Sequence, residues 1–149
     1  SKEAVKNFDI MPEPGADLEE EVFFVEPVTK GGKAVAMLQN KRGNRAIYMN
    51  WSTQSLPCFT IWKYGALCED GYVIGLEPGT SFPNFKSFER EKNRVPKLGP
   101  GESVCMSLSF EFFDSLRDIR QLKEQIRLLQ GMKKRQLSIS PLPEFSPVV

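Results

Sequence analysis

The feature that most constrains the fold is a series of short β-prone runs, each closed by glycine, proline or asparagine. The runs 34–39 and 45–51 flank Asn40-Lys41-Arg42-Gly43-Asn44, a pattern typical of a β-hairpin. Apolar and polar residues alternate over 103–113, which indicates a half-buried strand. Short strands with regular turn signals favour an all-β antiparallel sandwich over a parallel α/β sheet. The expected strands are 22–25, 34–39, 45–51, 58–64, 72–76 and 103–113.

The sequence from 114 to 135 indicates an amphipathic helix. Residues 115–118 resemble a capping box, and Gly131 suits a helix end, so the helix is expected over 116–130. Residues 117–135 hold seven lysines and arginines against two acidic residues. We interpret this basic excess as solvated charge on a helix that docks against the sandwich. The alternative of a coiled coil is disfavoured because the apolar stripe is too short. The stripe consists of Ile119, Leu122, Ile126 and Leu129.

The chain has 149 residues, which is enough for one domain with its own core. Four parts are expected along it. They are an N-terminal lead-in over 1–21, a β-sandwich domain over 22–113, the basic helix over 114–135 and a flexible, proline-rich tail over 136–149.

Composition argues against several classes of function. The net charge of +1 gives no global reason to expect nucleic acid, and no apolar run approaches the ~20 residues that cross a membrane. The sequence has no histidine, and its three cysteines form neither a disulfide framework nor a zinc motif. We therefore expect no metal, no organic cofactor and no secretion signal. The expected setting is the cytoplasm, with buried and reduced thiols.

One carboxylate stands in an unusual place. Glu77 closes the apolar run 72–76, and Pro78 and Gly79 then turn the chain. A carboxylate is costly to bury, so one at the end of an apolar strand often has a functional reason. The alternative is that Glu77 caps a turn, or pairs with Lys63 or Arg90.

The order of residues around Glu77 resembles the aldose 1-epimerase (galactose mutarotase-like) superfamily. There, a strand ends in a leucine–glutamate pair, and a proline and an asparagine follow, as they do here within 75–84. The longer stretch 73–91, the turn 98–103 and the strand 59–64 look like an uncharacterised branch of aldose epimerase-like proteins. The resemblance covers roughly residues 25–113.

The resemblance implies a β-supersandwich that binds a hexose in a shallow cleft. In such proteins the glutamate, here Glu77, takes the proton of the anomeric hydroxyl while a histidine protonates the ring oxygen. This chain has no histidine and resembles only the C-terminal half of the fold. The implied partners are therefore a sugar and either further copies of the chain or a complementing N-terminal half. Exposed sheet in a half-sandwich is a reason to expect such association.

Four further residues are candidates for holding the sugar. Trp62 could stack on the apolar face of a sugar, although core packing explains it equally well. Lys63 lies on the other face of the same strand and either reaches a cleft or points to solvent. Asn84 and Arg90 follow Glu77 and could bind hydroxyls, and the alternatives are a loop hydrogen bond for Asn84 and a surface ion pair for Arg90.

Two functions remain open at this point. The first is a carbohydrate-binding, aldose 1-epimerase-like domain that interconverts anomers when a partner supplies the acid. The second is a non-catalytic β-sandwich module that assembles through exposed sheet and the C-terminal helix.

Overall fold

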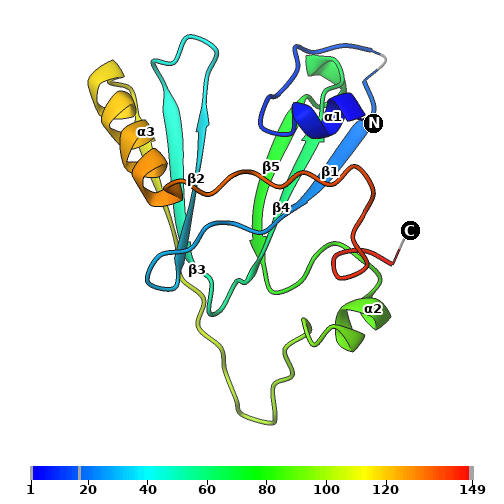
Figure 1. The fold of residues 1–149 in the computed structure, drawn as a ribbon. Coiled ribbons are helices and arrows are strands. Elements are labelled where there is room, and N and C mark those ends of the chain that lie inside the picture. Colours follow the sequence, from blue (N-terminus) through cyan, green and yellow to red (C-terminus); the bar gives the residue numbers. More distant parts are fainter. Residues whose placement is uncertain (1, 17, 148–149) are drawn as a thin grey trace. The chain divides into compact units, whose positions relative to one another are not determined.

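The computed structural model describes residues 2–16 and 18–147 of the chain, which are mostly β-structure with a C-terminal helix (Figure 1). All six predicted strands are present, and the helix predicted over 116–130 has those bounds. The elements are α1 (Lys2–Lys6), β1 (Glu20–Val25), β2 (Lys33–Gln39), β3 (Ala46–Ser52), β4 (Cys58–Tyr64), the 3₁₀ turn η1 (Cys68–Asp70), β5 (Val73–Gly79), α2 (Lys86–Glu91), β6 (Leu108–Phe113) and α3 (Leu116–Gln130).

The chain divides into two compact units, each built around one three-stranded antiparallel sheet. Unit 1 comprises Ser1–Glu26, Cys58–Lys97 and Arg135–Val149, and it holds the sheet β1-β4-β5. Unit 2 comprises Pro27–Pro57 and Leu98–Lys134, and it holds the sheet β2-β3-β6 together with α3. The antiparallel sheets and the C-terminal helix confirm the predicted fold class.

The register of unit 1 decides which side chains share a face of its sheet. Phe24, Thr60 and Glu77 stand opposite one another across the three strands, and Trp62 stands opposite Gly75 in the neighbouring row. Opposite residues in antiparallel strands point to the same side. We call the side that carries Trp62 and Glu77 the Glu77 face.

The N-terminal segment of unit 1 is fastened by a buried lysine. Lys63 is 2% exposed, and its Nζ donates to the carbonyls of Asn7 and Ile10 at 3.1 and 3.0 Å. The same ammonium lies 3.0 Å from the Glu21 carboxylate and 4.8 Å from the centre of the Phe23 ring. Complete pairing of this kind is what allows a charge to be buried.

Unit 2 buries the middle of its sheet and exposes one edge. Trp51 and Met49 on β3 are each 1% exposed. The sheet ends at β6, where Phe110 and Phe112 are 64% and 65% exposed. The predicted half-buried strand over 103–113 is therefore wrong in two respects. The strand begins only at Leu108, and Leu108, Phe110 and Phe112 are exposed because the described residues do not cover that side of β6.

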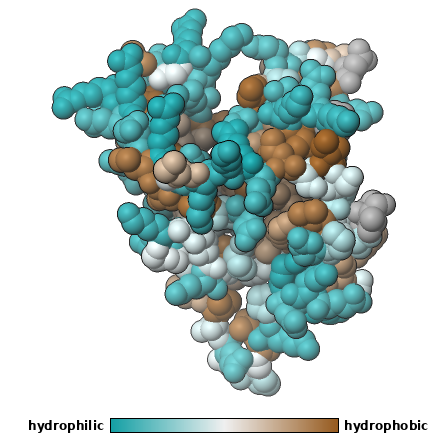
Figure 2. Space-filling view, viewed as in Figure 1, coloured by the Kyte–Doolittle hydropathy of each residue, from teal (hydrophilic) through white to brown (hydrophobic). Residues whose placement is uncertain are grey.

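The helix α3 follows the predicted amphipathic pattern. The Ser115 hydroxyl accepts a hydrogen bond from the Asp118 backbone N–H, as a helix N-cap requires. Ile119 and Leu122 are buried, and the charged residues of the helix are exposed. Figure 2 shows hydrophilic side chains extending outward around α3, at the upper left of the view.

Three short elements were not predicted from the sequence. They are α1, η1 and α2, each of six residues or fewer. Helices this short lack a readable apolar period. The thiols also differ from expectation, because Cys58 is buried but Cys68 and Cys105 are exposed, and all three are free.

Candidate functional site

Glu77 lies near the end of β5, and its side chain is exposed on the Glu77 face. The carboxylate folds back over Gly75, two residues earlier on the same side of the strand. A methyl group on Gly75 would collide with the Glu77 Oε1 atom. The glycine is therefore the residue that leaves room for the carboxylate in this position.

Trp62 borders the same space from the neighbouring strand. It stands directly opposite Gly75, so its indole and the Glu77 carboxylate occupy adjacent rows of one face. The Trp62 Nε1–H donates to the Glu20 carboxylate at 2.6 Å, which fixes the ring in the plane of that contact. Val22 and Val73 beside it are 45% and 39% exposed. The face thus offers a partly exposed indole ring with a carboxylate on either side.

This arrangement suits a polyhydroxylated ligand. An aromatic ring packs against the apolar C–H face of a sugar, and carboxylates accept hydrogen bonds from hydroxyl groups. A carboxylate that reaches the anomeric hydroxyl can also remove its proton. Among the strand residues of the Glu77 face there is neither lysine nor arginine, so the described strands supply no cation for a phosphate here.

The structure places Lys63 away from Glu77 and Trp62. Register puts Lys63 on the opposite side of β4, opposite Glu21 and Ile74. Its ammonium is occupied by Glu21 and by the two backbone carbonyls described above. Its place in the fold is therefore that of a fastening residue beneath the sheet.

Asn84 and Arg90 lie in different environments in the structure: Asn84 is half-buried and Arg90 is exposed. The Asn84 Nδ2 donates to the Glu89 carboxylate and to the Phe145 carbonyl, each at 2.7 Å. The backbone hydrogen bond of Asn84 therefore goes to the C-terminal tail rather than to its own loop. Arg90 is exposed and lines a shallow surface hollow with Asn93, whose φ of 58° is unusual for a residue other than glycine.

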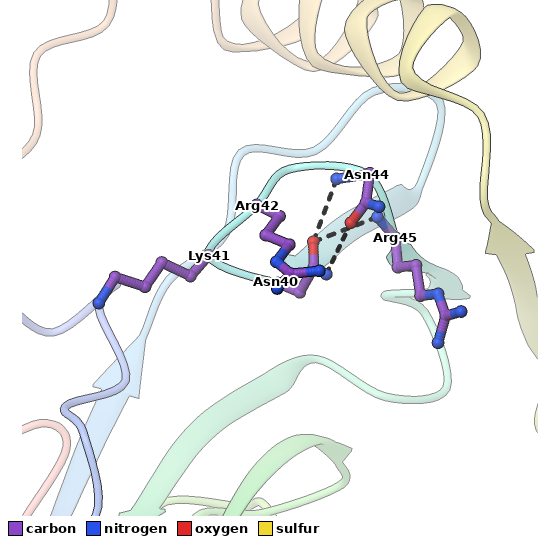
Figure 3. Close-up of a pocket in the computed structure, with 5 residues that line it drawn as sticks. All are labelled: Asn40, Lys41, Arg42, Asn44 and Arg45. Carbon is purple, nitrogen blue, oxygen red and sulfur yellow. Dashed lines mark hydrogen bonds between the residues drawn. The ribbon is translucent and has the colours of Figure 1, made fainter.

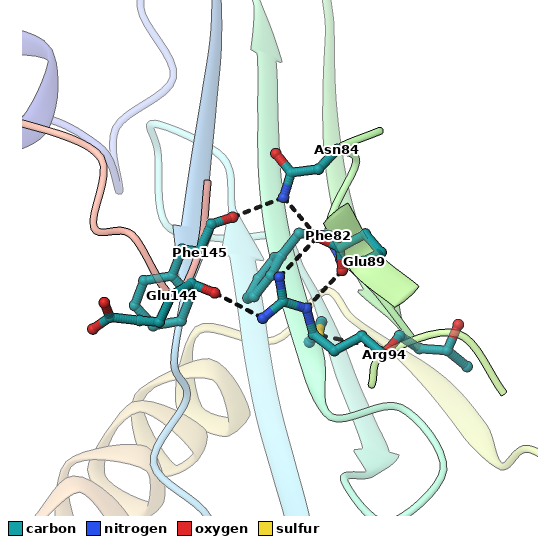
Figure 4. A network of polar contacts seen from close by, with 8 residues as sticks. Phe82, Asn84, Glu89, Arg94, Glu144 and Phe145 are labelled. Carbon is teal, nitrogen blue, oxygen red and sulfur yellow. Dashed lines mark hydrogen bonds and ion pairs between the residues drawn. The ribbon is translucent and has the colours of Figure 1, made fainter. Parts of the chain in front are cut away.

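A buried ion pair at the end of the same loop was not predicted (Figure 4). Glu89 is 1% exposed, and it accepts hydrogen bonds from the Nε and Nη2 atoms of Arg94 at 2.6 and 2.8 Å. The Phe82 backbone N–H also donates to it, at 3.2 Å. Arg94 then donates to the Glu144 carbonyl at 2.7 Å. The loop after β5 and the C-terminal tail are therefore joined through this Glu89–Arg94 network.

Electrostatics within the network favour both charges. Burial by itself raises the pKa of Glu89, but hydrogen bonds from Arg94, Asn84 and the Phe82 backbone hold that pKa below its usual range. The hydrogen bond to Glu89 raises the pKa of Arg94. Nearby, burial raises the pKa of the Cys58 thiol, whose sulfur contacts the Thr80 carbonyl at 3.7 Å.

Aromatic rings connect the network to the Glu77 face. Phe82 stacks on Phe24 with ring centres 4.8 Å apart, and Phe24 belongs to the row of Glu77. On its other sides Phe82 meets the edge of Phe145 and the Arg94 guanidinium, at 5.4 and 5.2 Å. The network thus holds in place the loop that follows Glu77, without presenting a reactive group of its own.

A second hollow, at the β2–β3 turn of unit 2, is basic but does not form a convergent site (Figure 3). Asn40 closes the turn by accepting hydrogen bonds from the backbone N–H groups of Asn44 and Arg45. Figure 3 shows the Lys41 and Arg45 side chains extending in different directions, away from a common centre.

Metal and membrane sites have no support within residues 2–16 and 18–147. No group of three or more His, Cys, Asp or Glu side chains in that part is arranged to hold a metal ion. None of its helices is long and apolar enough to cross a bilayer.

Sequence reasoning missed Gly75, Glu20, Glu89 and Arg94. The spacing of Gly75 and Glu77 was a readable signal, since residues i and i+2 of a strand share a face. The other three depend on contacts that span long stretches of chain or join side chains within an irregular loop.

Comparison with known proteins supports an epimerase-like fold. Residues 1–112 match the family described as a domain of unknown function, DUF4432. No curated protein matches the chain. A crystal structure of a candidate aldose 1-epimerase from Klebsiella pneumoniae subsp. pneumoniae MGH 78578 is similar, with a TM-score of 0.83 and 30% sequence identity.

That similarity covers 89% of this chain and 35% of the Klebsiella chain. The chain therefore spans about a third of the length of the solved structure. The resemblance to aldose 1-epimerases expected from the residues around Glu77 is confirmed, and so is the β-sandwich fold class that it implied.

Proposed function

Because the chain belongs to the DUF4432 family and has an aldose epimerase-like fold, we propose that it binds an aldose on the Glu77 face. One observation carries the proposal. Trp62 and Glu77 lie in adjacent rows of one sheet face, and the Glu77 carboxylate folds over Gly75, which has no side chain to displace it. The sugar ring stacks on Trp62, and its hydroxyls meet the carboxylates of Glu77 and Glu20.

The reaction that fits this geometry is the interconversion of sugar anomers. Glu77 takes the proton of the anomeric hydroxyl, the bond between the anomeric carbon and the ring oxygen breaks, and the ring oxygen takes up a proton. Rotation and reclosure then give the other anomer. The proton for the ring oxygen comes from a group outside this chain, which has no histidine. Glu77 is accordingly a sugar-anchoring carboxylate in this chain and a general base once that acid is supplied.

The other three predicted site residues have different roles in this proposal. Asn84 keeps the loop after Glu77 attached to the Glu89–Arg94 network, and Lys63 keeps the N-terminal segment on the opposite side of the sheet. Arg90 is exposed on α2 and remains a candidate for a contact with a sugar hydroxyl.

The test combines sugar binding with anomer exchange, both followed by proton NMR. The unmodified chain should bind an aldohexose, and Trp62→Ala should weaken the binding by up to about tenfold because the stacking surface is lost. Where exchange is accelerated, Glu77→Gln should slow it by roughly 10²-fold. Glu91→Gln is the matched control, since Glu91 is an exposed carboxylate on α2. If the folded, unmodified chain binds no aldose, the proposal is wrong.

A further inference from the structure

The strand β6 at the edge of the unit 2 sheet has backbone groups available for pairing with another strand. The sheet runs β2-β3-β6, so β6 has a hydrogen-bonded neighbour on one side only. Natural sheets protect such edges with lysine, proline or a bulge. The sequence of β6, Leu108-Ser109-Phe110-Glu111-Phe112-Phe113, contains neither lysine nor proline, and its pairing with β3 is regular over residues 108–113.

The backbone groups at this edge belong to the apolar residues. The Ser52 N–H donates to the Ser107 carbonyl, so this opposite pair is hydrogen-bonded, and the following pairs alternate. Ser109 and Glu111 therefore point their backbone groups toward β3. Leu108, Phe110 and Phe112 point theirs outward, and their side chains are 42%, 64% and 65% exposed.

We propose that β6 pairs in antiparallel fashion with β6 of a second copy of this chain, with the two Phe110 residues opposite each other. In this register Leu108 of each copy faces Phe112 of the other, which covers an apolar strip on one side of the joined sheets. On the other side Glu111 faces Ser109. Every residue of this interface belongs to unit 2.

Charge and strand length select this register over its neighbours. A shift of two residues in one direction would place Glu111 opposite Glu111, and like charges directly opposite destabilise a pair. A shift of two in the other direction would place Phe112 opposite Met106, which lies outside β6. Shifts by one residue would set outward-pointing backbone groups against inward-pointing ones. The strand is thus complementary to itself about Phe110.

The occupancy of the edge is tested by sedimentation across a concentration series. The unmodified chain should dimerise, and Phe110→Lys should weaken self-association at least about tenfold, because two ammonium groups would be brought together. The control is Leu128→Lys, since Leu128 on α3 in unit 2 is 74% exposed and lies outside β6. A chain that stays monomeric into the high micromolar range overturns the proposal, as does a dimer that Phe110→Lys leaves intact.

The register is tested by disulfide formation, with Cys68 and Cys105 first replaced by serine because both are exposed. Hydrogen-bonded opposite residues have Cα atoms about 5.5 Å apart, within the range of a disulfide. Phe110→Cys should therefore give a covalent dimer on mild oxidation, whereas Ser109→Cys should not. Crosslinking through position 109 alone, or through neither position in a dimeric sample, contradicts this pairing. The proposal is also wrong if this chain stays monomeric by itself and instead binds a longer epimerase-like chain.

Discussion

Unit 1 and unit 2 each contain one three-stranded sheet, but unit 1 buries charged side chains and unit 2 exposes both charged and apolar ones. Unit 1 has nine lysines and arginines against fourteen acidic residues, and it buries two ion-paired centres, at Glu89 and at Lys63. Unit 2 has eleven basic residues against five acidic ones, and most of these charges lie on the β2–β3 turn and on or next to α3. Unit 2 instead leaves Phe110 and Phe112 of β6 exposed.

The two units differ in how many segments must be held against the sheet. In unit 1 three long segments must stay fixed around one sheet: the N-terminal segment, the loop after β5 and the tail. Buried charges with complete sets of partners fix them in one geometry. Unit 2 has a hairpin, one further strand and a helix, which local signals already specify. Its apolar edge is therefore available for pairing with another strand.

Removing one half of the buried Glu89–Arg94 pair should have the largest effect on stability. Arg94→Met should lower the unfolding free energy of unit 1 by about 3–5 kcal/mol, because Glu89 would be left buried and charged without its cation. Each unit has one tryptophan, Trp62 in unit 1 and Trp51 in unit 2, so their indole N–H signals report urea unfolding of each unit separately. Arg90→Met, at an exposed arginine four positions earlier, should change little. An equal loss in both variants would contradict the network's role.

The fastening of the N-terminal segment should have a smaller effect. Lys63→Met removes the donor that serves Glu21 and the carbonyls of Asn7 and Ile10, at a cost of about 2 kcal/mol. The loss is smaller because Glu21 is partly exposed and water can replace the ammonium. Faster hydrogen exchange of the β1 and β4 amide groups should accompany it. Unchanged exchange and unchanged stability would show that the segment is held in another way.

Acid should weaken unit 1 through the same network. The pKa of Glu89 is lower in the folded chain than its usual value of 4.5, so its ionised form stabilises the fold. This contribution is complete above the unfolded pKa and is lost as the pH falls through the lower folded pKa. The stability of unit 1 should therefore decline below about pH 4.5. In Glu89→Gln, the stability of unit 1 should depend less on pH in this range. If the pH dependence is unchanged, the decline comes from other carboxylates.

The smallest effect is expected at the exposed edge. Phe112→Ser, measured at dilution where the chain is monomeric, should lower the stability of unit 2 by no more than about 1.5 kcal/mol. Phe112 is a large aromatic residue, but it is 65% exposed and so loses little buried area on truncation. A loss of several kcal/mol would mean that β6 contributes to the core of the monomer.

The sequence predicted those parts of the fold whose signals are local. The β2–β3 hairpin follows from Asn40 and Gly43, and Gly43 has the positive φ of 68° that such a turn uses. The helix α3 follows from its cap at Ser115 and its apolar spacing. The strand that carries Glu77 and its resemblance to aldose epimerases were likewise readable from adjacent residues. Its end was not, because β5 continues through Pro78 to Gly79 where the sequence predicted a turn.

The rest of the site depends on contacts between distant residues. Arg94 meets Glu144, and Asn84 meets Phe145, across about fifty and sixty positions of sequence. No local pattern announces such pairs. Burial of β6 was wrongly expected for the same reason, because alternation shows which side of a strand is apolar but not whether anything covers it.

The two tryptophans allow a direct test of whether Trp62 and Glu77 form one sugar-facing surface. Their indole N–H signals, assigned with Trp62→Phe, are followed while an aldohexose is added. The Trp62 signal should shift in a saturable way, because its ring lies on the Glu77 face and its N–H is bonded to Glu20. The signal of Trp51, which is 1% exposed, should stay in place. Two results would contradict a shared sugar-facing surface. One is a Trp62 signal that does not move at saturating sugar. The other is a Trp62 shift of the same size in the Glu77→Gln and Glu91→Gln variants, where both variants bind the sugar as well as the unmodified chain.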